Sequence, residues 1–365
     1  MKLKKKITAL CAAILLLVAA SLCAAMLWQV REQSYGALLL RSLDSLDELA
    51  VSLETAVYQT SYEMGSALSW RVFLTHCFRS CGTAGTILLH SRLPRTCACL
   101  LAGAALAVSG AIIQSVLANP LAAPNIIGVN AGAGLMVALA CALAPTALAL
   151  TPVLAFLGAM AGVLLVLAIA RRTGASRLTV ALAGVAVSSV FNAGIDAVVT
   201  FVPDTLNSYA DCRVGSLANL TLDRILPAGA LIVIALLLAL TLAGERDVLL
   251  LGEDVARSLG LNAGRSRMVL LAVAAALAGA AVSFAGLLGF VGLIVPHMAR
   301  RLVGEDSRPL LVASALGGAA LLTGCDLLSR LLFAPYALPG GIVLSLGGGP
   351  FFLWLLLKQR GGRTP

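Results

Sequence analysis

A stretch of 75 residues, from Thr96 to Ala170, contains no Asp, Glu, Lys, Arg or His. A helix needs about 20 apolar residues to cross the hydrocarbon core of a bilayer, so this stretch is too long for one crossing or for two. Proline-bearing segments at Asn119–Asn125 and Pro145–Pro152 interrupt it. The stretch therefore predicts three membrane-spanning helices that are joined by two turns.

The composition extends this conclusion to the whole chain. Hydrophobic residues make up 60% of the 365 residues, charged residues make up 12%, and the mean hydropathy is +0.98. A typical soluble domain is roughly 45–50% apolar, with glycine included, and about 25% charged. The difference excludes a soluble enzyme, a disordered chain and a disulfide-framework protein. We therefore predict an all-α, polytopic membrane protein.

Further apolar runs complete the predicted set of helices. They cover 7–28, 178–203, 225–243, two crossings within 268–299, 309–329 and 340–357, which gives about ten transmembrane helices in all. Small residues recur at helical spacing in three pairs: Gly128 with Gly132, Gly158 with Gly162, and Gly103 with Ala107. Because small residues let helix backbones approach closely in lipid, these pairs predict faces of helix packing.

The distribution of basic residues predicts the orientation. Cytoplasmic loops are enriched in Lys and Arg, and an N-terminus on the inside places 17 of the 26 basic residues in cytoplasmic segments. Six of the other nine lie in 29–95, and long segments translocate largely regardless of charge. Both termini are therefore predicted to be cytoplasmic. The net charge of +9 follows from this topology and does not indicate a nucleic-acid partner.

The chain lacks the phosphate-binding loop of P-loop ATPases. It contains no Gly-x4-Gly-Lys-Ser/Thr loop, which excludes nucleotide binding in the P-loop manner. Two acids fall within predicted spans, and Asp326 stands four residues before Arg330, which predicts a local ion pair. Asp196 is compatible with a proton relay in an ion-coupled secondary transporter, or with an acid that faces a water-filled cavity. The second interpretation places the energy source in another subunit.

The largest predicted cytoplasmic loop, 245–267, has an amphipathic pattern. Val248, Leu251, Val255 and Leu259 recur at helical spacing, and Glu253, Asp254 and Arg257 occupy the other side. The pattern predicts a short helix that lies in the lipid interface or in a groove on a partner, and the paired acids favour the protein groove. His297 has no metal-ligating neighbour in the sequence, so we predict a structural role for it and no metal site.

Six groups of residues, which together cover about 85–358, resemble the FecCD-type permeases, the membrane subunits of bacterial ABC importers for iron-siderophores, haem and cobalamin. The groups are Arg92-Leu93-Pro94-Arg95; Gly110, Gln114, Asn119-Pro120-Leu121-Ala122, Pro124, Gly128, Gly132 and Gly134; Leu182-Ala183-Gly184 with Gly215-Ser216-Leu217; Leu251-Gly252, Ala256 and Ser258-Leu259-Gly260; Gly289-Phe290-Val291-Gly292-Leu293, Pro296-His297 and Arg300; and Asp326, Arg330, Leu338-Pro339, Gly341 and Pro350-Phe351.

The resemblance implies a BtuC-like permease bundle in the bacterial cytoplasmic (inner) membrane. The implied partners are a second permease subunit, identical or paralogous, two cytoplasmic ATPase subunits that bind ATP and Mg, and an extracytoplasmic substrate-binding protein. No cofactor is expected in this chain. The implied segments are a first transmembrane helix with its basic N-terminus at 1–28, an extracytoplasmic segment at 29–91, a permease core with nine further helices at 92–358, a coupling loop at 245–267 and a cytoplasmic tail at 359–365.

The resemblance also implies roles for individual residues of this chain. Docking of the binding protein falls to Arg92, Arg95 and Arg330. Coupling to the ATPase falls to Leu251, Gly252, Glu253, Asp254, Ala256, Arg257, Leu259 and Gly260. The cytoplasmic gate falls at Asn119, Pro120, Leu121, Gly174 and Ser176, and the pathway passes Asp196, Gly215 and Ser216.

The chain departs from the family pattern in two places. The family usually has a tryptophan a few residues before Gly-Ser-Leu, whereas this chain has Cys212-Arg213 there. The outer mouth of the pathway is therefore expected to be more polar than usual. The outer segment 29–91 is also longer than usual, and its leucine spacing predicts an additional amphipathic helix.

Overall fold

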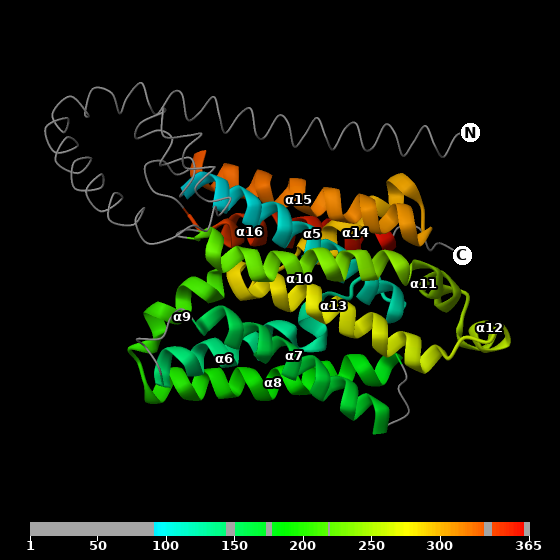
Figure 1. The fold of residues 1–365 in the computed structure, drawn as a ribbon, viewed down its shortest axis with the longest axis horizontal. Coiled ribbons are helices and arrows are strands. Elements are labelled where there is room, and N and C mark those ends of the chain that lie inside the picture. Colours follow the sequence, from blue (N-terminus) through cyan, green and yellow to red (C-terminus); the bar gives the residue numbers. More distant parts are fainter. Residues whose placement is uncertain (1–90, 144–149, 173–176, 218–219, 332–337, 361–365) are drawn as a thin grey trace, which may run out of the picture. The chain divides into compact units, whose positions relative to one another are not determined.

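The computed structural model describes residues 91–143, 150–172, 177–217, 220–331 and 338–360, and every regular element in this part of the chain is a helix (Figure 1). The elements are α5 (Leu93–Val116), η3 (Pro124–Ile127), α6 (Val129–Leu143), α7 (Thr151–Arg172), α8 (Arg177–Phe201), α9 (Thr205–Val214), α10 (Leu222–Thr241), α11 (Ala243–Leu250), α12 (Glu253–Ser258), α13 (Ala263–Ala285), α14 (Val291–Val303), α15 (Ser307–Leu331) and α16 (Gly340–Arg360). The all-α prediction is confirmed. The predicted first helix, most of the outer segment and most of the C-terminal tail lie outside the described residues.

Six of the described helices are long and apolar enough to span a membrane: α5, α7, α8, α10, α13 and α15. Helix α6 and the apolar part of α16, Gly340–Phe351, are shorter. The two helices predicted within 268–299 are α13 and α14. Helix α14 has 13 residues, which rise about 20 Å at 1.5 Å per residue, and the hydrocarbon core is about 30 Å thick. By itself α14 therefore crosses only part of the bilayer.

The chain breaks after α5 at the predicted proline-bearing segment. Ala118 adopts a positive φ of 47°, and Pro124 stands at the start of the short 3-10 helix η3, which has four residues. Gly128 then ends η3 in the left-handed conformation, with φ +84°, and α6 starts at the next residue. Prolines and a left-handed glycine thus turn the chain between two membrane helices, because neither residue continues a helix easily.

Helices α5 and α13 are the most completely buried of the long helices. A hydroxyl links them directly, since Ser109 Oγ donates a hydrogen bond of 2.6 Å to the Ala274 carbonyl oxygen. Helix α13 also packs against α6, α7 and α10, and α15 packs against α14 and α16. The remaining faces of α7, α8 and α10 carry many exposed leucines and valines, as expected for helices in contact with lipid or with another subunit.

Glycines set the closest helix contacts, as the small-residue pairs predicted. A Cβ on Gly132 would collide with the carbonyl oxygen of Gly158, and a Cβ on Gly103 would collide with that of Gly318. A third contact was not predicted as a pair: a Cβ on Gly110 would strike the backbone of Gly292. These contacts hold α6 against α7, and α5 against α15 and α14.

The short helix α9 was not predicted from the sequence. It follows α8 after a break at Val202–Asp204. Its sequence mixes polar and apolar residues in similar proportion. It packs against α6, and its Tyr209 side chain is buried. The Cys212-Arg213 pair, noted above as a departure from the family pattern, lies on this helix.

Candidate functional site

The predicted coupling loop folds as two short helices, α11 and α12. Gly252 separates them with a φ of +106°, a conformation that residues other than glycine rarely adopt. The predicted amphipathic segment is helical, and this glycine divides it into two helices. Leu251, Val255 and Leu259 are nevertheless all exposed, at 63%, 44% and 62%. They form a small apolar surface on and around α12, which we call the α12 apolar surface.

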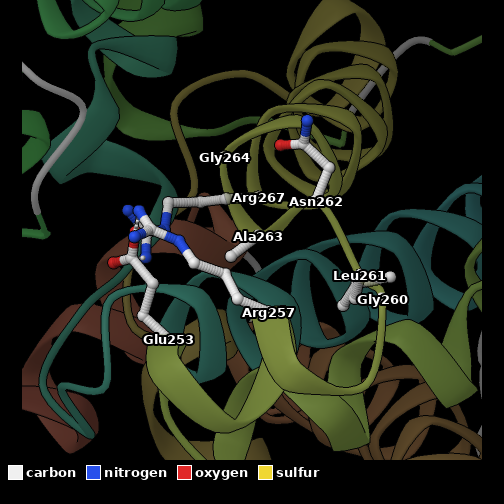
Figure 2. A pocket seen from close by; sticks show the side chains of 8 residues that line it. All are labelled: Glu253, Arg257, Gly260, Leu261, Asn262, Ala263, Gly264 and Arg267. Carbon is white, nitrogen blue, oxygen red and sulfur yellow. Dashed lines mark hydrogen bonds and ion pairs between the residues drawn. The ribbon is translucent and has the colours of Figure 1, made fainter.

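The polar side of α12 is tied to the start of α13. Glu253 accepts a hydrogen bond of 2.8 Å from Arg257, one turn along α12, and it pairs with Arg267 of α13 at 3.4 Å (Figure 2). A pocket of about 500 Å³ lies beside them, and its wall continues through Gly260–Gly264. The α12 helix is thus fixed to the first turns of a buried membrane helix, and movement of one is expected to displace the other.

Arg246 on α11 is the largest fully buried side chain in the described part of the chain, at 1% exposure. Its Nε donates a hydrogen bond of 2.8 Å to Ser115 Oγ near the end of α5, and its Nη1 donates to Ser307 Oγ at the start of α15. Ser307 Oγ in turn donates to the Asp247 carboxylate, whose oxygen also accepts the Ser307 backbone N–H at 3.1 Å. One guanidinium therefore joins the coupling segment to two membrane helices.

The position of this charge at the end of α5 has a physical reason. Helix α5 carries no basic residue in its own last turn, where the helix dipole favours a cation. Arg246 reaches this end from α11, and Arg300 reaches it from α14 through a hydrogen bond to Gln114 Oε1. Burial, and secondarily the charge of Arg300, lowers the pKa of Arg246 to about 10. The guanidinium therefore stays protonated at neutral pH.

Gln114 extends the network from α5 to α14. Its Nε2 donates to the Gly292 carbonyl oxygen at 3.1 Å, beside the close contact of Gly110 with Gly292. The backbone carbonyl oxygen of Gln114 also accepts a hydrogen bond of 3.0 Å from the backbone N–H of Asn119. Asn119 is thereby held directly under the end of α5.

The structure describes three of the five residues that were predicted for the gate. Asn119 and Pro120 are exposed, Leu121 is half-buried, and the Asn119 Oδ1 atom accepts the Leu121 N–H at 2.9 Å. These three residues therefore form a compact turn on the side of α5 where the coupling segment is attached. The other predicted gate residues, Gly174 and Ser176, lie outside the described residues.

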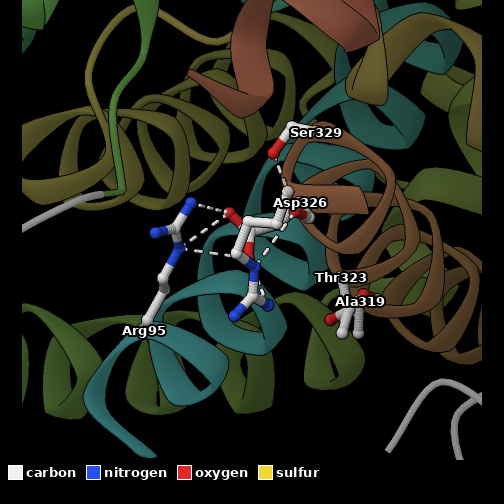
Figure 3. A network of polar contacts seen from close by, with 6 residues as sticks. Arg95, Ala319, Thr323, Asp326 and Ser329 are labelled. Carbon is white, nitrogen blue, oxygen red and sulfur yellow. Dashed lines mark hydrogen bonds and ion pairs between the residues drawn. The ribbon is translucent and has the colours of Figure 1, made fainter. Parts of the chain in front are cut away.

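Two of the three arginines predicted for docking, Arg95 and Arg330, share the Asp326 carboxylate at the opposite end of α5, and Figure 3 shows Arg95 beside Asp326. The Asp326 carboxylate is buried and pairs with Arg330 at 2.9 Å, which confirms the predicted local ion pair. It also pairs with Arg95 of α5 at 2.7 Å, and the Arg95 Nε donates to both of its oxygens. We call these three residues the Asp326 cluster. Arg92 lies one turn before Arg95 and is half-buried.

The predicted pathway residues lie on separate elements. Asp196 is exposed on α8, where its backbone oxygen accepts the Thr200 hydroxyl at 2.7 Å. Gly215 is buried with a φ of +74°, and its carbonyl oxygen accepts the Gly341 N–H at 3.3 Å. Ser216 follows it directly and is half-buried. Gly215 and Ser216 therefore lie beside the start of α16.

His297 is half-buried on α14, and its Nε2 atom has no hydrogen-bond partner. Across the described ranges, no group of three His, Cys, Asp or Glu residues is arranged to hold a metal ion. The buried Arg246 was missed as a functional residue in the sequence, where it counted only as a cytoplasmic charge. No local signal distinguishes it from the exposed arginines around it, because its partners stand 131 and 61 residues away.

The chain is similar in sequence to permease proteins of known transport systems. The hemin transport system permease protein HmuU of Yersinia pestis is 39% identical over 285 residues, which is 76% of this chain and 85% of that protein. The Fe(3+) dicitrate transport system permease protein FecD of Escherichia coli is 37% identical over 292 residues, 80% of this chain and 91% of that protein.

A solved structure and a family match extend the comparison. A metal-chelate type ABC transporter in an inward-facing conformation superposes with a TM-score of 0.69 and 29% identity, over 74% of this chain and 88% of that chain. Residues 50–358 match the FecCD transport family. The chain belongs to the FecCD transport family and is the permease subunit of an ABC transporter, without an ATPase domain of its own.

Proposed function

We propose that this chain is the permease through which a bacterial cell imports haem or an iron chelate such as iron-citrate or a siderophore. A substrate-binding protein would deliver the chelate from outside, and two cytoplasmic ATPase subunits that bind ATP and Mg would supply the energy. The named relatives, which carry hemin and Fe(3+) dicitrate in their descriptions, support this class of substrate. The chain itself carries out no chemistry on the chelate.

The attachment of the coupling segment to the helix ends carries this proposal. A partner that grips the exposed α12 apolar surface would pull on α11 and α12 together. Arg246 would pass that pull to Ser115 and Ser307, at the ends of α5 and α15. The turn at Asn119 follows α5 directly, so displacement of α5 would displace the proposed gate. ATP binding in the partners would thereby rock the helices from outward to inward opening.

The proposed topology places both termini, the coupling loop 245–267 and the tail 359–365 in the cytoplasm. The helix predicted within 1–28 would precede an extracytoplasmic segment at 29–91 and the permease core at 92–358. Arginines support this orientation, because Arg171, Arg172 and Arg265 gather on the same side as α12. The membrane would be the bacterial cytoplasmic (inner) membrane.

The exposed face of α8 supports a second permease subunit. Leu178, Leu182, Val185 and Val190 are between 57% and 70% exposed along it, and the polar Asp196 lies on the same helix. A charged side chain in a membrane helix normally faces a bundle interior or a water-filled cavity. We propose that two copies, identical or paralogous, enclose the pathway between them, with Asp196, Gly215 and Ser216 along it.

The Asp326 cluster supports a docking site on the outer face, and Arg92 is proposed for docking from its sequence motif alone. The shared carboxylate fixes the guanidiniums of Arg95 and Arg330 in place, and each of these side chains keeps about 15% of its surface exposed. Fixed guanidinium groups suit recognition of carboxylates, because their planar donors match a carboxylate in two-point contact. A binding protein with acidic residues at its contact surface would fit this face.

Reconstitution tests the proposal. The chain is placed in liposomes with its ATPase and binding-protein partners, and uptake of haem and of iron-citrate is measured with and without ATP. Uptake that requires ATP and the binding protein is expected. Uptake by the chain alone on a proton or sodium gradient, abolished by Asp196→Asn, would instead establish the ion-coupled secondary transporter.

A further inference from the structure

A groove of about 640 Å³ opens between the end of α7 and the start of α13. It is lined by Leu164, Leu167, Ala168, Arg171, Arg172, Arg265, Met268, Val269 and Ala272. The lining combines apolar side chains with three arginines, and it includes no carboxylate. The Asp326 cluster contributes no residue to it, and Arg265 is the one lining residue that falls within the predicted coupling loop 245–267.

The three arginines converge from two helices. Arg171 and Arg172 form the last turn of α7, and the Arg171 Nε atom lies 2.7 Å from the Met268 sulfur on α13, so this side chain reaches across the groove. In the part of the chain that the structure describes, none of the three pairs with an acidic side chain. Charge complementarity therefore calls for an anion.

Arg265 makes this requirement stronger. It stands in the first turn of α13, where the helix dipole disfavours a cation, and that turn contains no acidic residue. The two arginines of α7 stand at a helix end where the dipole favours them. Three positive charges thus gather at one point, and one of them is placed against its own helix dipole.

The apolar part of the groove continues an exposed apolar stripe. Along α7 the side chains of Val153, Leu157 and Leu164 are 55%, 52% and 56% exposed, and Val269 on α13 is 39% exposed. Helices α7 and α13 are both long and apolar enough to span the membrane. The stripe therefore runs along two spanning helices and ends at the arginines.

We propose that this groove binds an anionic phospholipid of the surrounding leaflet, with its headgroup phosphate on the three arginines and an acyl chain along Leu164 and Val269. Basic pockets between membrane helices on the cytoplasmic side are suited to such headgroups. A free phosphate ion would use the arginines but not the apolar wall. An acidic surface of the ATPase would likewise leave the exposed stripe of α7 without a partner.

Native mass spectrometry of the full-length chain in detergent tests the site. Phosphatidylglycerol and phosphatidylcholine with identical acyl chains are added, and the bound lipids are counted. We expect clear preference for phosphatidylglycerol. Since a basic side chain near an anionic headgroup contributes about 1 kcal/mol, Arg171→Gln and Arg265→Gln should each lower its affinity about fivefold. The exposed Arg301→Gln on α14 is the matched control and should leave the affinity unchanged.

A second variant keeps all charges. Ala168→Trp fills the exposed apolar wall, and it should displace phosphatidylglycerol while the elution volume on size exclusion stays that of the folded chain. Equal loss in Arg301→Gln, or retained lipid preference in both Arg171→Gln and Arg265→Gln, would overturn the proposal. Loss of ATPase association in these two variants with unchanged lipid preference would show a protein contact instead. Displacement of the lipid by millimolar inorganic phosphate would also contradict an acyl-chain site.

Discussion

Arg246→Met is the substitution that separates a coupling role from a structural one. The change removes the guanidinium that joins α11 to Ser115 and Ser307, and it keeps an unbranched apolar side chain in the buried space. The remaining hydroxyls keep partners, because Ser115 Oγ still donates to the Ala111 carbonyl oxygen at 2.8 Å and Ser307 Oγ still donates to Asp247. The variant therefore leaves no buried charge without a counterpart.

The expected loss of stability is small for this reason. Two hydrogen bonds from a charged donor contribute about 1.5–3 kcal/mol each. The desolvation penalty of a buried ion is also several kcal/mol, and the variant no longer carries it. The two contributions nearly cancel, so we expect the free energy of unfolding to change by no more than about 2 kcal/mol. A thermal melt of the purified chain measures this change.

Coupling is expected to suffer much more than stability. In liposomes that contain the complete transporter, the measurement is the number of substrate molecules imported per ATP hydrolysed. Energetic coupling between sites is typically 1–3 kcal/mol, so its loss should lower this ratio about 5- to 150-fold. Arg246→Lys, which keeps the charge but offers one nitrogen instead of a fork, should retain part of the ratio. Arg301→Met on α14 is the control, and a wild-type ratio in Arg246→Met would refute the reasoning.

The same residue gives a pH prediction. Burial lowers the folded-state pKa of Arg246 to about 10, so the charged form is destabilised in the folded chain. Its burial penalty is fully present below pH 10 and disappears only as the pH rises toward the ordinary pKa of a guanidinium in the unfolded chain. Between pH 6 and 9 the guanidinium stays charged, so any change of the import ratio with pH should be the same in the native chain and in Arg246→Lys. A pH dependence in this range that is present in the native chain and absent in Arg246→Lys would contradict the assigned protonation state.

Three further substitutions test other parts of the molecule. Gly110→Ala places a methyl group against the backbone of Gly292, so overpacking should destabilise the chain by about 1–3 kcal/mol or more, seen as a lower melting temperature, whereas Gly289→Ala meets no atom within 4 Å and should not. Asp326→Asn leaves two arginines without their shared carboxylate and should destabilise the folded chain by about 3–5 kcal/mol; an unchanged melt would count against a buried ion pair. Leu259→Glu places a charge on the α12 apolar surface and should weaken ATPase binding in a pull-down without altering the melt.

Much of the helical architecture could be predicted from the sequence, because the bilayer imposes a length on every apolar run. The uncharged stretch contains α6 and nearly all of α5 and α7, and the prolines mark the breaks between them. The small-residue pairs also predicted real contacts, such as that of Gly132 with Gly158, since only small residues let backbones meet. These properties are local in the chain, and composition and spacing therefore report them.

The features that were missed depend on residues far apart in the chain. Arg246 is surrounded in sequence by exposed residues, and its burial follows only from the arrival of α5 and α15. The ion pair of Arg95 with Asp326 was also not predicted, because 231 residues separate the two side chains in the chain. The break at Gly252 is different, because the glycine itself marks it in the sequence, although the apolar residues before and after it keep a helical spacing.

The contacts of α5 explain how the attachment of α11 through Arg246 can act on several membrane helices. At one end α5 is fixed to α15 by the pair of Arg95 with Asp326, and along its length Gly103 and Gly110 contact α15 and α14. At the other end Arg246 bridges the same two helices, α5 and α15. Tightly packed helices transmit strain because packed interiors have low compressibility. A pull on α11 is therefore expected to displace α5, α14 and α15 as one body, and the turn after α5 is the first non-helical segment that this displacement reaches.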